Sequence, residues 1–419
     1  MSNWKLVKLS TLCQRIGDGL HGTPKYENNG EVYFINGNNL KNGFIVLDSD
    51  TKRVSNSEFL RNYIELNENT LLLGINGTLG NMAFYRGEKI MLGKSSAYLN
   101  FKSDINKFFY YYFQLPSVQK YFYDVATGST IKNLSLKSLQ DFEVPKPEPE
   151  EYRKIAAVLS ALDDKIELNN KINAELEAMA KTLYDYWFVQ FEFPNADGKP
   201  YKSSGGKMVY NETLKREIPE GWEDCTLGDI SNLVRGVSYN KQDIQSEIHE
   251  DTIKILRATN ITKNIIDLND PILVSNSFVK EEQVLKPFDI LITMSSGSID
   301  HIGKNGFYYF DEKVAFGAFC AKIQMDELFR YYIYLYMQSN VFSSTIKNEC
   351  LGTNINNLNG SMVKGFKHIK PSKYILERFN SLVEPCFKKI RVNIKQNQEL
   401  ATLRDWLLPM LMNGQVRVE

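Results

Sequence analysis

The chain carries two copies of one sequence template, and this duplication constrains its fold more than any other feature. The first copy spans about residues 4–187 and the second about residues 222–411. The glycine-containing loop INGTLG at 75–80 has its counterpart in MSSGSI at 294–299, and each copy then enters a long helical pattern at an unchanged offset. Because the repeat is far longer than the unit of a solenoid, it predicts a tandem pair of domains rather than an array.

The bulk composition sets the number of domains but leaves the partner open. A chain of 419 residues is long enough for two or three domains, each with its own core. Its 43% hydrophobic and 24% charged residues are ordinary values for a globular protein. The 50 Lys and Arg residues balance 50 Asp and Glu residues, so the formal net charge is zero. Composition therefore does not identify a nucleic-acid-binding protein, and any basic surface must be local.

Cysteine and histidine usage bears on compartment and metal binding. The five cysteines are scattered and form no CxxC motif, which favours reduced thiols in a cytoplasm over a disulfide framework. Four histidines are too few to favour a metal cluster with His ligands. No signal-peptide pattern opens the chain, and apolar stretches such as DILITM are too short to cross a bilayer. We therefore expect a soluble cytoplasmic protein that binds neither a metal nor a membrane.

Strand-like and helix-like runs occur in both copies. EVYFING, NTLLLGI and NMAFYR have the composition of strands and are bounded by Asn and Gly. FFYYYFQL at 108–115 and YYIYLYMQ at 331–338 occupy equivalent places in the two copies. Both stand before helix-compatible segments, and they predict buried helices packed on a sheet.

A long helix is expected after each of these regions. In the first copy the linker EVPKPEPEE at 143–151 contains prolines that exclude a regular helix, so the helix should begin just after them. From 155 to 187, seam residues recur at alternating spacings of three and four, as in a coiled coil, and the second copy repeats the pattern. The apolar seam includes Leu162, Ile166, Leu176, Ile390 and Leu400.

Two asparagines interrupt the seam at matching positions of the two helices. If the helices pack antiparallel, Asn169 meets Asn397 and Asn173 meets Asn393. Polar residues in such a seam usually cost stability and fix the register. The alternative is two amphipathic helices on separate cores, with the asparagines at the wet margin. A paired rod of roughly 33 residues would be about 50 Å long, more than one turn of duplex DNA at about 34–36 Å, and could set the distance between two sites.

These patterns divide the chain into five segments. The expected fold class is α+β, with two tandem α/β domains of one fold joined by two long antiparallel helices that form a coiled-coil spacer. The expected segments are a first domain at 1–148, a first spacer helix at 149–190, a connecting segment at 191–221, a second domain at 222–372 and a second spacer helix at 373–419.

No catalytic motif is present in the sequence. GEKIMLGKS at 87–95 comes close to a phosphate-binding loop, but it has five residues between its glycines where the motif has four, so a turn between strands is the better interpretation. The sequence has no amino-methyltransferase loop of the N-P-P-[FY] or D-P-P-Y type, no cofactor-binding glycine fingerprint and no Glu-x-Lys pair of a nuclease. These absences predict a subunit that binds and positions rather than an enzyme.

The turn-like segments are rich in side chains that bond to base edges and phosphates. Asn pairs well with adenine, and Arg or Lys with guanine, whereas Ser, Thr and backbone amides suit phosphates. For any single residue plain turn chemistry is the simpler alternative, and for His21 a surface or turn role is favoured over ligand contact. For the set as a group, DNA contact is favoured. The candidates in the first copy are His21, Thr23, Lys25, Asn36, Asn38, Asn39, Asn76, Thr78, Ser129, Thr130, Lys132 and Asn133. Those in the second are Arg235, Arg257, Thr259, Asn260, Ser295, Ser296, Ser298, Thr353, Asn354, Asn356 and Asn357.

Taken together, the chain resembles the specificity subunit of type I restriction-modification enzymes. The resemblance covers the whole length and rests on the tandem copies, each opening with W-x-x-x-x-L. It also rests on GSTIKNLSLKSLQDFEVPKPEPEEYRKIAAVLSALDDKIELNNK at 128–171, and on LYDYWFVQFEFP, KMVYNETLKREIPEGW and LGTNINNLNG. It implies two recognition domains that each read half of a split, asymmetric sequence in double-stranded DNA. It also implies that the helices act as a ruler and dock two methylation subunits.

The same resemblance places the chemistry in partner subunits. Methylation subunits would hold S-adenosylmethionine and methylate adenine, and separate restriction subunits would use ATP and Mg for translocation and cleavage, so this chain would bind no cofactor itself. Two alternatives remain, a protein scaffold without DNA reading and a methyltransferase that lacks recognisable motifs. Salt-dependent DNA binding with a sequence preference would argue against a scaffold, and cofactor binding by the isolated chain would favour the enzyme.

Overall fold

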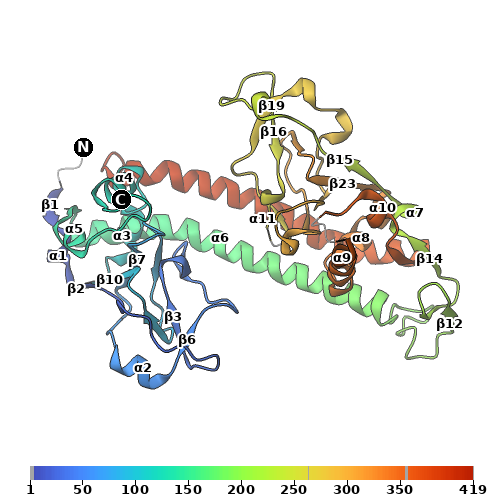
Figure 1. The fold of residues 1–419 in the computed structure, drawn as a ribbon, viewed down its shortest axis with the longest axis horizontal. Helices are drawn as coiled ribbons and strands as arrows, with labels where there is room; N and C mark the ends of the chain where they lie inside the picture. The colour runs from blue at the N-terminus through green and yellow to red at the C-terminus, as the bar shows by residue number, and fades with distance from the viewer. Residues whose placement is uncertain (1–3, 263, 354–356, 419) are drawn as a thin grey trace. The chain divides into compact units, whose positions relative to one another are not determined.

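The computed structural model describes residues 4–262, 264–353 and 357–418, which form two compact units (Figure 1). Unit 1 consists of Met1–Glu167 and Gln398–Glu419, and unit 2 consists of Leu168–Asn397. Each unit contains one mixed domain and parts of two long helices, α6 (Pro149–Tyr184) and α11 (Lys373–Met412). The helix α6 continues as a π-helical turn at Asp185–Val189.

Unit 1 is built on a four-stranded antiparallel sheet in the order β2-β10-β7-β8. A second sheet, β6-β3-β9, contains a parallel pair, and two short antiparallel pairs, β1-β11 and β4-β5, complete the unit. The strands are β1 (Lys5–Lys8), β2 (Cys13–Asp18), β3 (Val32–Ile35), β4 (Leu40–Lys41), β5 (Phe44–Ile45), β6 (Arg53–Val54), β7 (Thr70–Gly74), β8 (Met82–Phe84), β9 (Ile90–Leu92), β10 (Ser96–Phe101) and β11 (Glu143–Lys146). The shorter helices are α1 (Leu9–Leu12), α2 (Asn56–Arg61), α3 (Asn106–Tyr112), α4 (Pro116–Val125) and α5 (Leu136–Asp141).

Unit 2 repeats this topology with additions. The order β15-β23-β20-β21 matches β2-β10-β7-β8 and is extended by β18 and β17, the sheet β19-β16-β22 matches β6-β3-β9, and β14-β24 matches β1-β11. The strands are β12 (Met208–Asn211), β13 (Arg216–Pro219), β14 (Glu223–Thr226), β15 (Ser231–Arg235), β16 (Thr252–Leu256), β17 (Ile261–Thr262), β18 (Ile265–Ile266), β19 (Ile272–Ser275), β20 (Ile290–Thr293), β21 (Asn305–Phe307), β22 (Val314–Phe316), β23 (Cys320–Met325) and β24 (Lys367–Lys370). The shorter helices are α7 (Leu227–Ile230), α8 (Arg330–Met337), α9 (Asn340–Thr353) and α10 (Gly360–Lys364). Two domains of one fold, as the duplication predicts, are therefore present.

The aromatic helices are buried against the sheets, as expected from the sequence. In unit 1, Phe109 of α3 stacks on Phe101 of β10 with ring centroids 5.0 Å apart. In unit 2, Tyr334 of α8 stacks on Phe307 of β21 at 3.8 Å. All four rings are buried. Each buried aromatic side chain removes about 150–250 Å² from water, so these helices supply much of the apolar stabilisation of their units.

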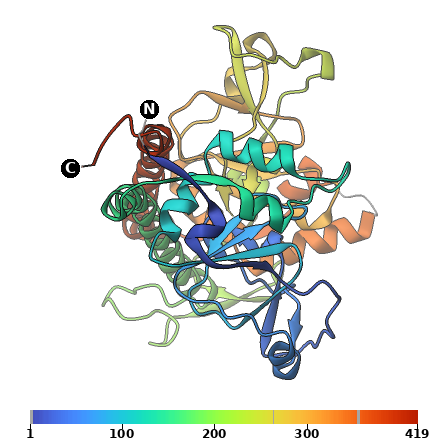
Figure 2. The ribbon, with the colours of Figure 1, turned by 90° about the vertical axis from the view of Figure 1, so that its left-hand side faces the viewer.

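The end of the chain belongs to the core of unit 1. Leu408, Leu411 and Met412 of α11 are buried in the same cluster as Phe108 of α3 and Leu159 of α6. Figure 2 shows unit 1 facing the viewer, with the C-terminal end of α11 close to the first turns of α6. The first α/β domain is therefore not an independent segment, because its core includes helical residues from the opposite end of the sequence.

The helix α6 begins where the proline-rich linker predicts. Pro149 occupies the first helical position, where the amide proton that proline lacks is not needed. Glu150 and Glu151 stand in the first turn, where carboxylates interact favourably with the helix dipole. The helix α11 begins at Lys373, the residue at which the second helical segment was expected to start.

Within unit 2, asparagines of α6 and α11 are bonded to each other. Asn169 Nδ2 donates to Asn397 Oδ1 at 2.8 Å, and Asn393 Nδ2 donates to Asn173 Oδ1 at 2.8 Å. These are the two pairs expected for antiparallel helices, and they are not compatible with helices on separate cores. Asn169 and Asn393 are buried, yet the side-chain Oδ1 atom of each has no hydrogen-bond partner, which costs stability. Of the predicted seam, Ile390 is buried and Leu176 is half-buried.

In unit 1 the same two helices are joined by a charged contact. Asp163 of α6 accepts hydrogen bonds from Tyr111 Oη and from Arg404 Nη1 of α11, both at 2.7 Å. The seam residues Leu162, Ile166 and Leu400 nearby are half-buried. In the second copy, Tyr334 stands at the position of Tyr111. Phe387 stands at the position of Asp163, and Ala180 at the position of Arg404.

Unit 2 is apolar at this place. Tyr334 and Phe387 pack at 5.5 Å, and Ala180 is buried in the same hydrophobic cluster. The two copies therefore stabilise equivalent contacts by different means. In unit 1, the charged triad of Tyr111, Asp163 and Arg404 joins the two long helices and the domain. In unit 2, an apolar contact takes its place.

We expect Arg404→Ala to lower the free energy of unfolding by about 1–3 kcal/mol, because it leaves the partly buried carboxylate of Asp163 with only one donor. The double variant Asp163→Phe/Arg404→Ala reproduces the apolar combination of unit 2 and should recover part of this loss. Chemical denaturation followed by circular dichroism measures both effects. An Arg404→Ala variant as stable as the parent chain would show that the triad is energetically neutral.

Candidate functional site

Loops from separate parts of the sequence meet at one edge of the main sheet in each unit. In unit 1 the glycine loop at 75–80 follows β7 and bonds to the polar loop at 126–136. Leu134 N donates to Ile75 O at 2.8 Å, and Gly77 N donates to Lys132 O at 3.3 Å. We call this arrangement, with the turn between β9 and β10 and the residues just after β2, the loop cluster of unit 1.

The glycine loop needs glycine at two of its positions. Gly77 has a φ of +74° and Gly80 a φ of +84°, a region that other residues rarely adopt. A Cβ atom on Gly80 would also collide with the side-chain amide of Gln119 in α4. The bend that sends the chain from β7 back to β8 is therefore fixed by these residues.

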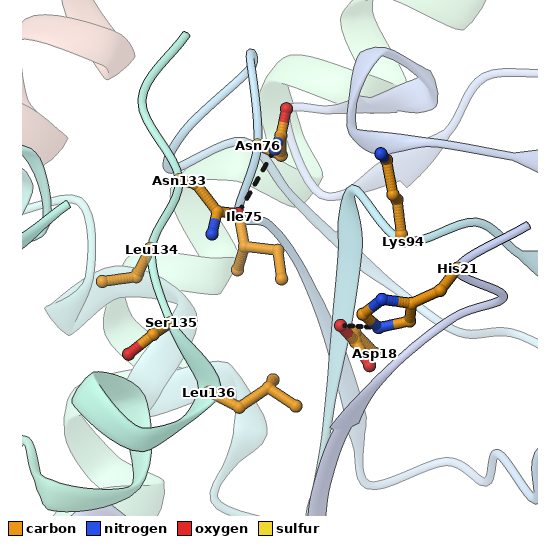
Figure 3. Close-up of a pocket in the computed structure, with 9 residues that line it drawn as sticks. All are labelled: Asp18, His21, Ile75, Asn76, Lys94, Asn133, Leu134, Ser135 and Leu136. Atoms are coloured by element: carbon orange, nitrogen blue, oxygen red, sulfur yellow. Dashed lines mark hydrogen bonds and ion pairs between the residues drawn. The ribbon is translucent and has the colours of Figure 1, made fainter. Parts of the chain in front are cut away.

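The loop cluster of unit 1 lines an open cavity of about 460 Å³ (Figure 3). Its lining residues are Asp18, His21, Ile75, Asn76, Lys94, Asn133, Leu134, Ser135 and Leu136. Asn76 Nδ2 donates to Asn133 Oδ1 at 3.3 Å across the two loops. On the other side, His21 Nε2 lies 2.8 Å from Asp18 Oδ2. The cavity thus gathers hydrogen-bond donors and acceptors and charges of both signs.

Unit 2 repeats the construction with matching backbone contacts. Leu358 N donates to Met294 O at 2.7 Å, as Leu134 N does to Ile75 O. Ser295 pairs with Asn357, as Asn76 pairs with Asn133. The loop cluster of unit 2 lines an open cavity of about 530 Å³. The lining residues are Val237, Ser238, Tyr239, Arg257, Ala258, Thr259, Ser295, Ser296, Gly297, Gly317, Ala318 and Phe319.

The side chains in the two cavities are different. The first contains Asp18, His21 and Lys94. The second contains Tyr239 and Phe319, whose ring is 68% exposed, beside hydroxyl groups and a single Arg. The cavities are also lined from partly different positions, since 133–136 line the first and 257–259 line the second, so they present unlike sets of contacts.

The structure brings some of the predicted DNA-contacting residues together in these cavities and leaves others outside them. His21, Asn76 and Asn133 line the first, and Arg257, Thr259, Ser295 and Ser296 line the second. Further predicted residues are exposed but line neither of these two cavities, namely Thr23, Lys25, Asn38, Ser129, Thr130, Arg235, Ser298 and Asn357. Thr353 ends α9, and Asn354 and Asn356 lie outside the described residues.

Two predicted residues have structural roles, so the prediction of DNA contact is wrong for them. Asn39 is buried, accepts from Asn36 N at 3.0 Å and donates to Val46 O at 3.1 Å. Asn260 is also buried and makes the equivalent contacts, accepting from Arg257 N at 2.8 Å and donating to backbone carbonyls. Both amides are buried and bonded to backbone groups that close a loop, so neither is presented to a base.

Other predicted residues are partly occupied by contacts within their own unit. Asn36 Oδ1 accepts from Ser95 Oγ at 2.8 Å, and Thr78 Oγ1 is buried. Lys132 Nζ lies 4.7 Å from the centre of the Tyr123 ring. Arg257 donates to the side chain and the carbonyl of Asp270, which ties down part of its guanidinium.

Four lining residues were not predicted, namely Asp18, Lys94, Tyr239 and Phe319, because a high content of Asn, Gly and Ser does not mark their positions. Lys94 was contained in GEKIMLGKS, which forms the strand β9 with a turn on each side rather than a turn alone. Phe319 lies in the equivalent turn of the second copy. The signal that could have found these residues is their position at the end of a strand of the main sheet or within a few residues of one.

The described residues contain no group of three or more His, Cys, Asp and Glu side chains that could hold a metal ion. Among them Cys13, Cys225, Cys320 and Cys386 are free thiols. Burial lowers the pKa of His368 to about 3, so this histidine is neutral at physiological pH. No helix in the described part of the chain is long and apolar enough to cross a membrane.

Comparison with known proteins agrees with the duplicated architecture. The family model described as type I restriction modification DNA specificity domain matches residues 1–178 and 219–400. The chain is 32% identical over 322 residues to the MjaIX specificity subunit of Methanocaldococcus jannaschii, covering 75% of this chain and 70% of that protein. It is 34% identical over 143 residues to the EcoKI specificity subunit of Escherichia coli K12, covering 34% of this chain and 31% of that protein.

The fold has a counterpart among solved structures. The crystal structure of the S subunit of a type I restriction-modification system from M. genitalium superimposes with a TM-score of 0.54 at 19% identity, covering 98% of this chain and 96% of that one. The chain belongs to the family of type I restriction-modification specificity subunits. The resemblance noted in the sequence is thereby confirmed.

We expect Asn39→Ala and Asn260→Ala each to lower the free energy of unfolding by about 1–3 kcal/mol, because each removes buried hydrogen bonds and leaves backbone groups unpaired. The neighbouring Asn38 is exposed, and Asn38→Ala is the matched control, with a change within about 0.5 kcal/mol. Urea denaturation measures all three variants. Equal stability of Asn38→Ala and Asn39→Ala would contradict the structural role of Asn39.

Proposed function

We propose that this chain is a DNA-reading subunit in which each α/β domain recognises one half of a split, asymmetric target. The observation that carries the proposal is the pair of loop clusters, which share backbone contacts but differ in their side chains. Two domains that share a backbone fold but present different side chains can recognise two different half-sites. The recognition domains would be residues 1–148 and 222–372.

The chemistry of the loop clusters fits double-stranded DNA. Amide side chains such as Asn76 and Asn133 can donate and accept at base edges, and Lys94 can reach guanine or a phosphate. In the second cluster the hydroxyl groups of Thr259, Ser295 and Ser296 suit phosphates and bases alike. The exposed polar residues that surround the cavities would add contacts to the backbone of the duplex.

We assign the unread gap between the half-sites to the two long helices acting as a coiled-coil spacer. The helix α6 has 36 residues, which corresponds to about 54 Å at about 1.5 Å per residue. This length exceeds one turn of duplex DNA, about 34–36 Å, so a rod of this kind could separate two contacts by a turn or more. The hydrogen-bonded asparagines of unit 2 would hold the register of the two helices.

Exposed apolar residues recur at equivalent positions of the two helices. Leu168 of α6 corresponds to Val392 of α11, and Met179 corresponds to Leu403; all four are exposed. On α6, Leu168 and Met179 are separated by about three helical turns and so share a face. Apolar side chains repeated in this way fit a partner that binds twice, which supports docking of two methylation subunits.

Partner subunits would hold the cofactors and carry out the chemistry. S-adenosylmethionine would be held by the methylation subunits, and ATP and Mg by the restriction subunits, which cut DNA. This chain would bind no cofactor and catalyse no step by itself. The competing possibility is a scaffold that holds the partner proteins and does not read DNA.

The proposal predicts a split methylation motif. Co-expression with a cognate methylation subunit in a methylation-free host, followed by genome-wide sequencing of modified adenines, should reveal two half-sites separated by a fixed gap. Assembly of the complex without any methylation would favour the scaffold. A short contiguous motif would mean that only one domain reads DNA.

The docking sites predict a stepwise loss of partners. Leu168→Glu and Val392→Glu should each release one of the two methylation subunits, because a charge is placed in an apolar contact, and the double variant should release both. The mass of the co-purified complex in analytical ultracentrifugation distinguishes the three states. Asp197→Asn, at an exposed turn outside the long helices, is the control and should retain both subunits. A double variant that also retains both would exclude these residues from the contact.

A further inference from the structure

Asp18 holds a carboxylate at the wall of the cavity in unit 1. It is the last residue of β2, and its pairing with Ala97 of β10 fixes its backbone. Its Oδ2 atom lies 2.8 Å from His21 Nε2, whereas its side chain is only 17% exposed and that of His21 is 75% exposed. Figure 3 shows both side chains on the opposite side of the cavity from Leu134 and Ser135. The carboxylate is therefore mostly shielded from solvent and has His21 as a hydrogen-bond partner.

A carboxylate is an unusual group in a DNA-contacting cavity. Asp18 is the one acidic residue in the described lining of this cavity, which also contains Asn76, Lys94 and Asn133. A carboxylate repels the phosphates of DNA, so it suits contact with a base edge that offers a donor rather than contact with the backbone. Lys94 and His21 supply basic groups beside it.

The base edges in the major groove differ in what they offer to a carboxylate. Guanine presents two acceptors, thymine presents an acceptor and a methyl group, and adenine presents an acceptor beside its amino group. Cytosine presents only the N4 amino donor, so it is the base whose edge does not repel a carboxylate. The guanine of the same base pair presents acceptors that suit a lysine.

The register of the sheets gives an independent comparison with the second copy. Ala97 pairs with Asp18 in the first copy, and the corresponding Ala321 pairs with Arg235 in the second. A hydrogen-bond acceptor and a donor thus occupy one structural position in the two units. Arginine is the usual partner of guanine, so opposite charges at this position fit half-sites with different bases.

We propose that Asp18 accepts a hydrogen bond from the N4 amino group of a cytosine in the half-site of the first domain, with His21 as the positioning residue. The proposal rests on the proposed function, because it requires that this domain reads DNA. It assigns one base pair of the target to one carboxylate oxygen. Lys94 lies on the cavity wall beside this contact and can serve the guanine of that pair.

The first test is the methylation motif of variant complexes. The complex of the full chain with its methylation subunit is prepared with Asp18→Ala, with the isosteric Asp18→Asn, and with Asp50→Asn as the control at an exposed position of unit 1. Both Asp18 variants should lose discrimination at one C·G position of one half-site, by on the order of tenfold, and leave the other half-site unchanged. The control should keep the parental motif. A parental motif in both Asp18 variants would overturn the proposal.

The second test changes the DNA and is read first on the parental complex. An oligonucleotide carries pyrimidin-2-one, which lacks the N4 amino group, in place of each cytosine of the half-site in turn. One such replacement should slow methylation by the parental complex on the order of tenfold and have little effect on Asp18→Ala. If the parental complex tolerates every replacement, the inference fails although the split motif stands. If the parental complex yields no split motif, the proposed function itself has failed.

Discussion

Stacked and edge-to-face aromatic rings join each α/β domain to the long helix that follows it, and the rest of each unit depends on this contact. In unit 1, Phe108 of α3 meets Tyr152 of α6 at 4.7 Å, and in unit 2, Tyr331 of α8 stacks on Phe387 of α11 at 5.2 Å. Because protein interiors are close-packed, a ring in such a position fixes both elements that it touches. The loop cluster of each domain is thereby held at a set orientation to its own helix.

The sequence was sufficient to predict the elements whose signals are local. Prolines mark the start of α6, and the aromatic runs identify α3 and α8, because hydrophobic pattern and turn residues act within a few positions of the chain. The asparagine pairs were also accessible, since antiparallel packing about a central point follows from the duplication. Their hydrogen bonds in unit 2 have the expected partners.

The contents of the loop clusters were less accessible, because they depend on long-range pairing. The parallel alignment of β3 with β9 and the return of β10 to β2 bring Lys94 and Asp18 to one cavity. The amide of Asn39 looks the same in the sequence whether it closes a loop or reads a base, so its role became clear only from its burial and partners. A polar side chain can be assigned to a ligand only after the backbone groups around it have been counted.

The charged triad of unit 1 has a consequence for exchanging recognition modules between related chains. Tyr111 belongs to the α/β domain, Asp163 to α6 and Arg404 to α11, so one contact draws on three stretches of sequence. A graft that ends at residue 148 would place a foreign domain against Asp163 and Arg404. These two charged groups would then lack the hydroxyl group of Tyr111 that Asp163 bonds in this chain. Transplants that carry the first turns of α6 and the last turns of α11 with the domain would keep donor and acceptor together. The natural boundary for swapping specificity in this chain therefore lies inside the helices, not at the proline-rich linker.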